Sequence, residues 1–152
     1  MIRVLFVCHG NICRSPMAEF IMKDLVKKEG LSHQFSIASA ATSTEEIGND
    51  VHYGTKRILE KYNIPFAKRG ARQITKADYE AYDYLIGMDT ANIRNMNRIF
   101  GDDNENKIYK LMTFAGSGKD VADPWYTGDF QETYEDVLLG CKGLLERIVN
   151  ES

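Results

Sequence analysis

The segment 8–15 brings together the residue types needed to bind an oxyanion and attack it. Its residues are Cys8, His9, Gly10, Asn11, Ile12, Cys13, Arg14 and Ser15. Five residues separate Cys8 from Arg14, which is enough chain to wrap once around a tetrahedral anion. Gly10 and Asn11 tolerate the backbone angles of a tight turn, and Arg14 can offer two parallel donors to two oxygens. Cys8 would lie beneath the central atom of the anion, where its thiolate is a nucleophile.

The flanking residues predict how this segment is held. Residues 2–7 form an apolar run with one charge near its start, which is typical of a strand buried on both faces. Ser15 and Pro16 predict the N-cap and first turn of a helix. Main-chain N–H groups between a strand and a helix can face inward and bind an anion, and the helix dipole helps. The glycine–lysine ending of the nucleotide P-loop is missing, so that kind of site is not indicated.

Strands and helices are predicted to alternate along the rest of the chain. Further strands are predicted at 35–40, 84–88 and 107–112, and further helices at 50–62, at 90–100 with Asp89 as cap, and at 130–148. Cys141 lies on the apolar stripe of the last helix, so we assign it to the core. This order predicts an α/β fold: a single three-layer domain over residues 1–152. We expect a four-stranded parallel sheet with helices on both faces and the phosphate-binding loop after the first strand.

Composition limits the classes of partner. The chain has 152 residues, 43% hydrophobic and 27% charged, as in an ordinary soluble globular protein. Its net charge of −3 gives no general attraction to nucleic acid or to an anionic membrane, so neither is an expected partner. An anion must therefore be bound by local groups rather than by the overall field.

The cysteines and histidines indicate neither a disulfide framework nor a metal site. There are three cysteines, and an odd, small number argues against structural disulfides. The histidines His9, His33 and His52 show no ligand spacing, so no metal and no other cofactor is expected. The longest apolar stretch near the start, 4–7, is far too short for a membrane span or a signal peptide. A cytoplasmic location is therefore the default expectation.

A second candidate group is Asp123, far from the loop in sequence. The chain has 22 acidic residues, so composition alone cannot select a general acid. Asp123 has the most suggestive context, because it is followed by Pro124, Trp125 and Tyr126 within the long stretch 113–128. That stretch follows the last predicted strand and can reach the carboxyl edge of the sheet, where ligands bind in such folds.

The run 7–16, VCHGNICRSP, closely resembles the signature of the low-molecular-weight protein tyrosine phosphatases. Further similar segments follow in order at 39–43, 46–49, 71–75, 88–89 and 123–126. The resemblance implies hydrolysis of phosphotyrosine, and of small aryl phosphates, through a phosphocysteine intermediate on Cys8. It also implies that Arg14 binds the phosphate, that Asp123 is general acid and then base, and that Ser15 stabilises the Cys8 thiolate as leaving group. The implied substrates are proteins that contain phosphotyrosine, and the implied inhibitors are inorganic phosphate and other oxyanions. The implied oligomeric state is a monomer or a weak dimer.

The resemblance assigns supporting roles as well. It implies that Asn11 shapes the loop through hydrogen bonds that include Ser39, and that Cys13 forms a reversible, protective disulfide with the nucleophile. The rim of the site would be formed by Trp125 and Tyr126 on one side and by Glu45 on the other. Two departures stand out. Glu45 lies where the family often has an aromatic residue, which would either weaken stacking on the substrate ring or shift preference towards basic neighbours in a substrate. Residues 68–70, Lys-Arg-Gly, replace a histidine that usually completes the loop network.

Three other functions fit the sequence less well. Arginine phosphatases of the same family usually carry threonine where this chain has Ile12, and this activity is the runner-up. Thioredoxin-coupled arsenate reductases share the loop but need a downstream cysteine pair, whereas only Cys141 lies downstream here. A non-catalytic phosphoprotein-binding module would lack the nucleophile or the acid, and both are present.

Overall fold

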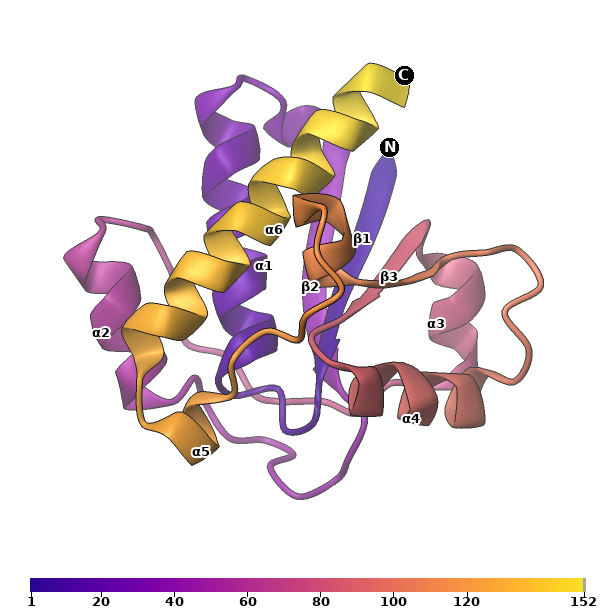
Figure 1. Ribbon diagram of the computed structural model, residues 1–152, viewed down its shortest axis with the longest axis horizontal. Helices are drawn as coiled ribbons and strands as arrows, with labels where there is room; N and C mark the ends of the chain where they lie inside the picture. Colours follow the sequence, from indigo (N-terminus) through magenta and orange to yellow (C-terminus); the bar gives the residue numbers. More distant parts are fainter. Residues whose placement is uncertain (152) are drawn as a thin grey trace.

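The computed structural model describes residues 1–151. A central sheet lies between two layers of helices, with α1, α2 and α6 on one side and α3 and α4 on the other (Figure 1). In chain order the elements are β1 (Ile2–Cys8), α1 (Arg14–Lys28), η1 (Ser32–Gln34), β2 (Phe35–Ala41), α2 (Tyr53–Lys61), α3 (Lys76–Ala81), β3 (Tyr84–Gly87), α4 (Thr90–Phe100), β4 (Ile108–Lys110), η2 (Leu111–Ala115), α5 (Pro124–Thr127) and α6 (Phe130–Glu151).

The sheet has four strands in the order β2-β1-β3-β4, and every pair is parallel. β1 is flanked on both sides, by β2 and β3, and its residues from Val4 to Cys8 are all buried. A strand that is covered on both faces and paired on both edges requires the uninterrupted apolar run seen in the sequence. The predicted α/β fold with a four-stranded parallel sheet is confirmed.

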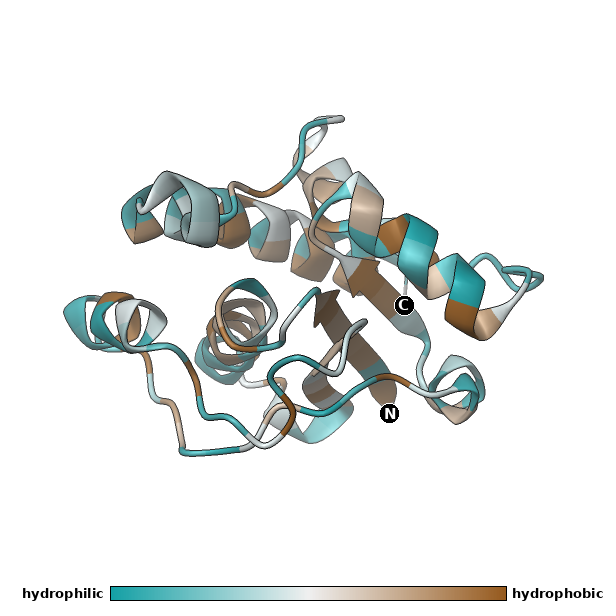
Figure 2. Ribbon diagram, turned by 90° about the horizontal axis from the view of Figure 1, so that it is seen from below, coloured by the Kyte–Doolittle hydropathy of each residue, from teal (hydrophilic) through white to brown (hydrophobic). Residues whose placement is uncertain are grey.

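Alternate residues of β1 enter two separate cores. Val4 and Phe6 pack with residues of α1 and α6, while Leu5 and Val7 pack with Tyr79 of α3 and residues of α4. This alternation follows from the two-residue period of a strand. In Figure 2 the hydrophobic strands lie between the two helical layers, whose helices carry both hydrophilic and hydrophobic residues.

Two predicted elements have clearly different bounds in the structure. The predicted strand 107–112 was wrong at its carboxyl end, because β4 stops at Lys110 and the 3₁₀ helix η2 follows. Leu111 is completely buried and packs closely against Gly140 of α6, so packing against α6 outweighs the local strand pattern. The predicted helix 50–62 starts later, at Tyr53, because His52 has a non-helical ψ of 142° and caps the helix by accepting the Gly54 N–H on its Nδ1 at 3.0 Å.

Helix α4 was predicted with its correct bounds and cap. The Asp89 carboxylate accepts from the main-chain N–H of Asn92 at 2.7 Å, as expected of an N-cap. The short helices α3 and α5 were not predicted. In α3, the Asp78 carboxylate reaches back to the Thr75 N–H at 2.8 Å, which is half of a capping box.

The carboxyl edge of the sheet gathers segments that are distant in sequence. Cys8 ends β1, Asp89 follows β3, and the stretch after η2 returns to the same edge, where the Val121 N–H donates to the Met88 carbonyl at 2.9 Å. The predicted meeting of the loop 8–15 with the stretch 113–128 is therefore confirmed. Within residues 1–151, no helix is both long and apolar enough to cross a membrane.

Candidate active site

The loop between β1 and α1 is short and sharply curved. β1 ends at Cys8 and α1 begins at Arg14, so five residues make the turn. Asn11, in the middle, has a φ of 59°, in the left-handed region that asparagine tolerates better than most residues. The prediction that Ser15 caps the helix was wrong. Cys13 occupies the N-cap position, and Ser15 lies within the first turn, where its hydroxyl points back into the loop.

The Cys8 side chain lies at the bottom of this loop, almost completely buried. Its sulfur is 3.0 Å from the Ser15 hydroxyl oxygen and accepts the Asn11 N–H at 3.3 Å. Each of the two contacts can place a hydrogen-bond donor on the sulfur. The α1 N-terminus, six residues further along at Arg14, adds the positive end of its dipole.

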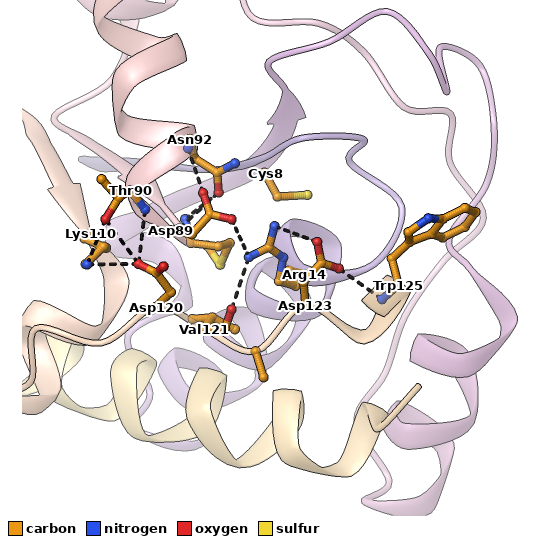
Figure 3. A network of polar contacts seen from close by, with 12 residues as sticks. Cys8, Arg14, Asp89, Thr90, Asn92, Lys110, Asp120, Val121, Asp123 and Trp125 are labelled. Carbon is orange, nitrogen blue, oxygen red and sulfur yellow. Dashed lines mark hydrogen bonds and ion pairs between the residues drawn. The ribbon is translucent and has the colours of Figure 1, made fainter. Parts of the chain in front are cut away.

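Arg14 is also buried, and its guanidinium joins three segments (Figure 3). Nη1 lies 2.9 Å from the Asp89 carboxylate and donates to the Val121 carbonyl at 3.2 Å. Nη2 lies 3.3 Å from the Asp123 carboxylate. Burial acts against the charge of Arg14, but the neighbouring anionic groups at Cys8, Asp123 and Asp89 outweigh it and raise the pKa of the guanidinium. A fixed cation is therefore held beside the loop.

Asp123 reaches this point from the opposite end of the chain. It caps the short helix α5, and one carboxylate oxygen accepts from the Trp125 N–H at 3.0 Å while the other faces Arg14. The cap explains why Asp-Pro occurs here, since proline is favoured in the first turn. With 28% of its side chain exposed, Asp123 remains open to the adjacent cavity.

Asp89 is a site residue that the sequence analysis assigned only as a helix cap. Its Oδ1 caps α4, and its Oδ2 pairs with Arg14. Its position directly after the buried strand β3 was the available signal, because that position lies at the ligand-binding edge of a parallel sheet.

A cavity of about 430 Å³ opens above the loop. The loop contributes Cys8, Gly10, Ile12, Cys13 and Arg14 to its lining. Its walls include every residue predicted for the rim together with part of α4: His9, Glu45, Glu46, Asp89, Ala91, Asn92, Asn95, Asp123, Trp125 and Tyr126. The structure thus brings together residues from four separate parts of the chain. Trp125 and Tyr126 are 68% and 85% exposed, so neither packs into the core.

Glu45 and His9 meet across one side of the cavity. The His9 Nε2 contacts a Glu45 carboxylate oxygen, and both side chains are more than half exposed. The contact links the phosphate-binding loop to the loop after β2. Because position 45 is a glutamate and not an aromatic residue, a polar contact between His9 and Glu45 lies at the mouth of the cavity.

A directional chain of hydrogen bonds supports the loop from below. Ser39 donates to the Glu19 carboxylate at 2.6 Å, so its oxygen is left to accept from Asn11 Nδ2 at 2.9 Å. The same Nδ2 donates to the Ser15 oxygen at 2.8 Å. The Ser15 hydroxyl proton is then available to Cys8, since its other acceptor, the Ala40 carbonyl, is 3.5 Å away. Ser39, predicted as loop support, lies within this chain.

The place of the missing histidine is taken by Arg69. Its Nη2 donates to the main-chain carbonyl of Asn11, and its Nη1 donates to the Asn49 carbonyl at 3.1 Å. Next to it, the Arg72 N–H donates to the Asn11 side-chain oxygen at 3.3 Å. A cation thus completes the support of the loop from the side opposite the cavity.

The other two cysteines differ from Cys8. Burial, with the charges of Cys8 and Asp123, raises the pKa of the Cys13 thiol to about 12. Cys141 is completely buried, as predicted, and burial raises its pKa well above the ordinary range. Among residues 1–151, no group of three or more His, Cys, Asp or Glu side chains is arranged to hold a metal ion.

A buried cysteine, an arginine and a facing aspartate at the carboxyl edge of a parallel sheet define a cysteine-based phosphatase site. Residues 3–152 match the family model described as low molecular weight phosphotyrosine protein phosphatase. The chain therefore belongs to the low molecular weight protein tyrosine phosphatases.

Individual relatives agree with this assignment. The low molecular weight protein-tyrosine-phosphatase YfkJ of Bacillus subtilis is 42% identical, over 99% of this chain and 98% of the relative. Its crystal structure covers 100% of this chain and 97% of that one with a TM-score of 0.96. PtpA of Staphylococcus aureus, of the same type, is 37% identical over 100% and 97% of the two chains. A solved Drosophila arginine phosphatase, DARP, is 27% identical with a TM-score of 0.88, covering 97% and 98%.

Proposed function

We propose that this chain hydrolyses phosphotyrosine in proteins, and small aryl phosphates, with Cys8 as the nucleophile. The observation that carries the proposal is the convergence of Cys8, Arg14 and Asp123 on one cavity from opposite ends of the chain. The arrangement has a nucleophile, an anion-binding cation and a carboxyl group, which are the groups that displacement at phosphorus requires.

In the first step, the main-chain N–H groups of the loop and the Arg14 guanidinium bind the phosphoryl oxygens and stabilise their charge. The Cys8 thiolate attacks phosphorus, and the bond from phosphorus to the tyrosine oxygen breaks. Asp123 donates a proton to that oxygen.

In the second step, water attacks the phosphocysteine. Asp123 now accepts the proton from that water, and the Cys8 thiolate leaves. Ser15 donates a hydrogen bond to the leaving sulfur. The chain of hydrogen bonds from Glu19 through Ser39 and Asn11 supports this role, because it leaves the Ser15 proton directed at Cys8. Inorganic phosphate and similar oxyanions would inhibit by occupying the same loop.

The rim sets the preferred substrate. Trp125 and Tyr126 are exposed beside the cavity and can flank an aromatic ring on one side. On the facing side, Glu45 and Glu46 supply negative charge. We expect basic residues next to phosphotyrosine to be favoured, because they complement these carboxylates.

We further propose that Cys13 protects Cys8 reversibly against oxidation, and we call this pairing the redox guard. Peroxide would oxidise the Cys8 thiolate to a sulfenic acid, and the Cys13 thiol would attack that sulfur with loss of water to form a disulfide. Both cysteines belong to the same tight loop, and both line the cavity. The high pKa of Cys13 keeps it protonated at neutral pH, so we expect closure of the disulfide to be slow.

Cellular context remains a prediction. A cysteine phosphatase with a free nucleophile needs a reducing compartment, so we propose a cytoplasmic location, which cell fractionation tests. A monomer or weak dimer is expected, and light scattering over a range of concentrations measures this.

Replacing Cys8 with serine tests the nucleophile. Cys8→Ser should abolish hydrolysis of p-nitrophenyl phosphate, because a neutral hydroxyl cannot replace the thiolate. Binding of phosphate should persist, since the loop amides and Arg14 remain. The measurements are steady-state turnover and calorimetric phosphate binding. Substantial residual turnover would exclude Cys8 as the nucleophile.

Replacing Asp123 with alanine tests the acid. A positioned acid typically contributes about 10²–10⁴-fold, and we expect Asp123→Ala to lose that factor with phenyl phosphate, whose leaving group needs a proton. The loss should be much smaller with p-nitrophenyl phosphate, a better leaving group. An equal loss of kcat with both esters would show that another residue is the acid.

Matched phosphotyrosine and phosphoarginine peptides decide between the main function and its runner-up. We expect phosphotyrosine to be cleaved faster by the native chain, and Ile12→Thr to raise the relative rate on phosphoarginine. Lysine beside phosphotyrosine should raise kcat/KM, and Glu45→Gln should reduce that gain. Faster phosphoarginine cleavage by the native chain would support the arginine phosphatase instead.

Peroxide treatment tests the redox guard. Activity should return on adding dithiothreitol to the native enzyme, whereas Cys13→Ser should lose activity irreversibly. Cys141→Ala is the matched control, because Cys141 lies in the core, and it should recover like the native enzyme. Full recovery by Cys13→Ser would rule out the proposed disulfide.

A further inference from the structure

The side of the phosphate-binding loop that faces away from the cavity is in contact with a second arginine. Arg69 lies on the segment between α2 and α3, is half-buried, and is not among the residues that line the cavity. Its guanidinium binds two main-chain carbonyls, that of Asn11 in the loop and that of Asn49. It therefore joins the loop to the segment that follows β2.

Asn11 is fixed by every polar group it has. Its N–H donates to Cys8, its side-chain nitrogen donates to Ser15 and Ser39, and its side-chain oxygen accepts from the Arg72 N–H. Its remaining polar group, the main-chain carbonyl, accepts from Arg69. The bond from Arg69 holds Asn11, whose backbone is left-handed, from the side of the loop that faces away from the cavity.

The carbonyl of Asn11 also controls the next amide. A trans peptide is planar, so its C=O and the following N–H point in opposite directions. When Arg69 holds the Asn11 carbonyl on the outer side, the N–H of Ile12 is directed away from Arg69. Ile12 lines the cavity on the inner side. A positively charged donor on the carbonyl also polarises the peptide unit, which makes its N–H a stronger donor to an anion.

Arg69 itself is held in place. Its own N–H donates to the Asp50 carboxylate at 3.1 Å, and Lys56 pairs with the same carboxylate at 2.7 Å. The hydrogen bond from Lys56 is the main reason why the pKa of Asp50 falls to about 2, so this anchor stays charged at neutral pH. Neighbouring main-chain bonds join Ala71 to Gly48 and Asn49, both at 2.8 Å.

The charge of Arg69 has anionic neighbours near the loop. Burial lowers the pKa of Arg69, while the charges of Glu19, Cys8 and Asp50 counteract part of that effect. Attraction between charges is mutual, so a cation at this position attracts negative charge on the Cys8 sulfur.

We propose that Arg69 is a positioning residue: by binding the Asn11 carbonyl it directs the Ile12 amide into the anion site and stabilises the Cys8 thiolate from outside the cavity. The proposal rests on the proposed function only in placing the reaction at this loop. It predicts that loss of Arg69 weakens oxyanion binding as well as turnover.

The test compares Arg69→Gln and Arg69→Lys with Lys68→Gln, a matched control that removes the exposed cation one position earlier. The readouts are the dissociation constant of inorganic phosphate, kcat and KM with p-nitrophenyl phosphate, and the pH profile of Cys8 alkylation by iodoacetamide. Phosphate binding and alkylation do not depend on turnover. Thermal unfolding of each variant measures any loss of stability.

We expect Arg69→Gln to bind phosphate more weakly and to lose kcat/KM by up to about 100-fold, the loss that a small misplacement of catalytic groups can cause. Its alkylation profile should move to higher pH. Lys68→Gln should match the native enzyme in all three readouts. Arg69→Lys should keep more of the native alkylation profile, because it keeps the charge, but should still bind phosphate more weakly since one ammonium cannot reproduce the guanidinium fork.

Native phosphate affinity and a native alkylation profile in Arg69→Gln would overturn the proposal. If that variant does not fold, Arg69→Lys carries the test, and native behaviour in both readouts would overturn the proposal equally. Failure of the proposed function looks different: the native chain would not hydrolyse phosphotyrosine, while the effect of Arg69 on phosphate binding would remain measurable.

Discussion

The Arg14 guanidinium is almost completely buried, and a cation in that position needs negative partners close by. It has two, Asp89 from the end of β3 and Asp123 from the turn before α5. Removing one partner from a buried ion pair typically costs about 3–5 kcal/mol, so the arginine constrains both segments strongly. The sheet supplies the common edge, and the ion pairs determine which side chains meet there.

The proposed site is built for an anion although the chain carries a net charge of −3. The binding groups are local: loop amides, one helix terminus and a guanidinium on each side of the loop. Arg14 faces the cavity, and Arg69 contacts the outer face at Asn11. Because the surrounding rim is acidic at Glu45 and Glu46, free anions gain little from the long-range field. Selectivity for a phosphoryl group must then come from the geometry of the loop.

The loop was predictable from sequence because Cys8 and Arg14 are close along the chain and the flanking patterns specify a strand and a helix. Asp123 required the family resemblance, since many other carboxylates were available. The partners of Asp89 and Arg69 could not be predicted, because each contact joins distant segments, although the position of Asp89 after a predicted strand was a usable signal. The predicted end of the last strand was wrong because the contact of Leu111 with α6 overrides the local strand pattern. Helix α3 was not predicted, although its capping signal, Thr75 followed three residues later by Asp78, is present in the sequence.

The three cysteines occupy very different environments, and this has a practical consequence for chemical labelling. Cys13 and Cys141 are buried and kept as neutral thiols at physiological pH, with the former at a pKa of about 12. Cys8 lines the same cavity as Cys13, but its sulfur accepts the Asn11 N–H and contacts the Ser15 hydroxyl. An electrophilic probe carrying an anionic group should therefore attach once per molecule, at the floor of that cavity. A fluorophore or a covalent inhibitor could then be attached at Cys8 alone, without removal of the other cysteines.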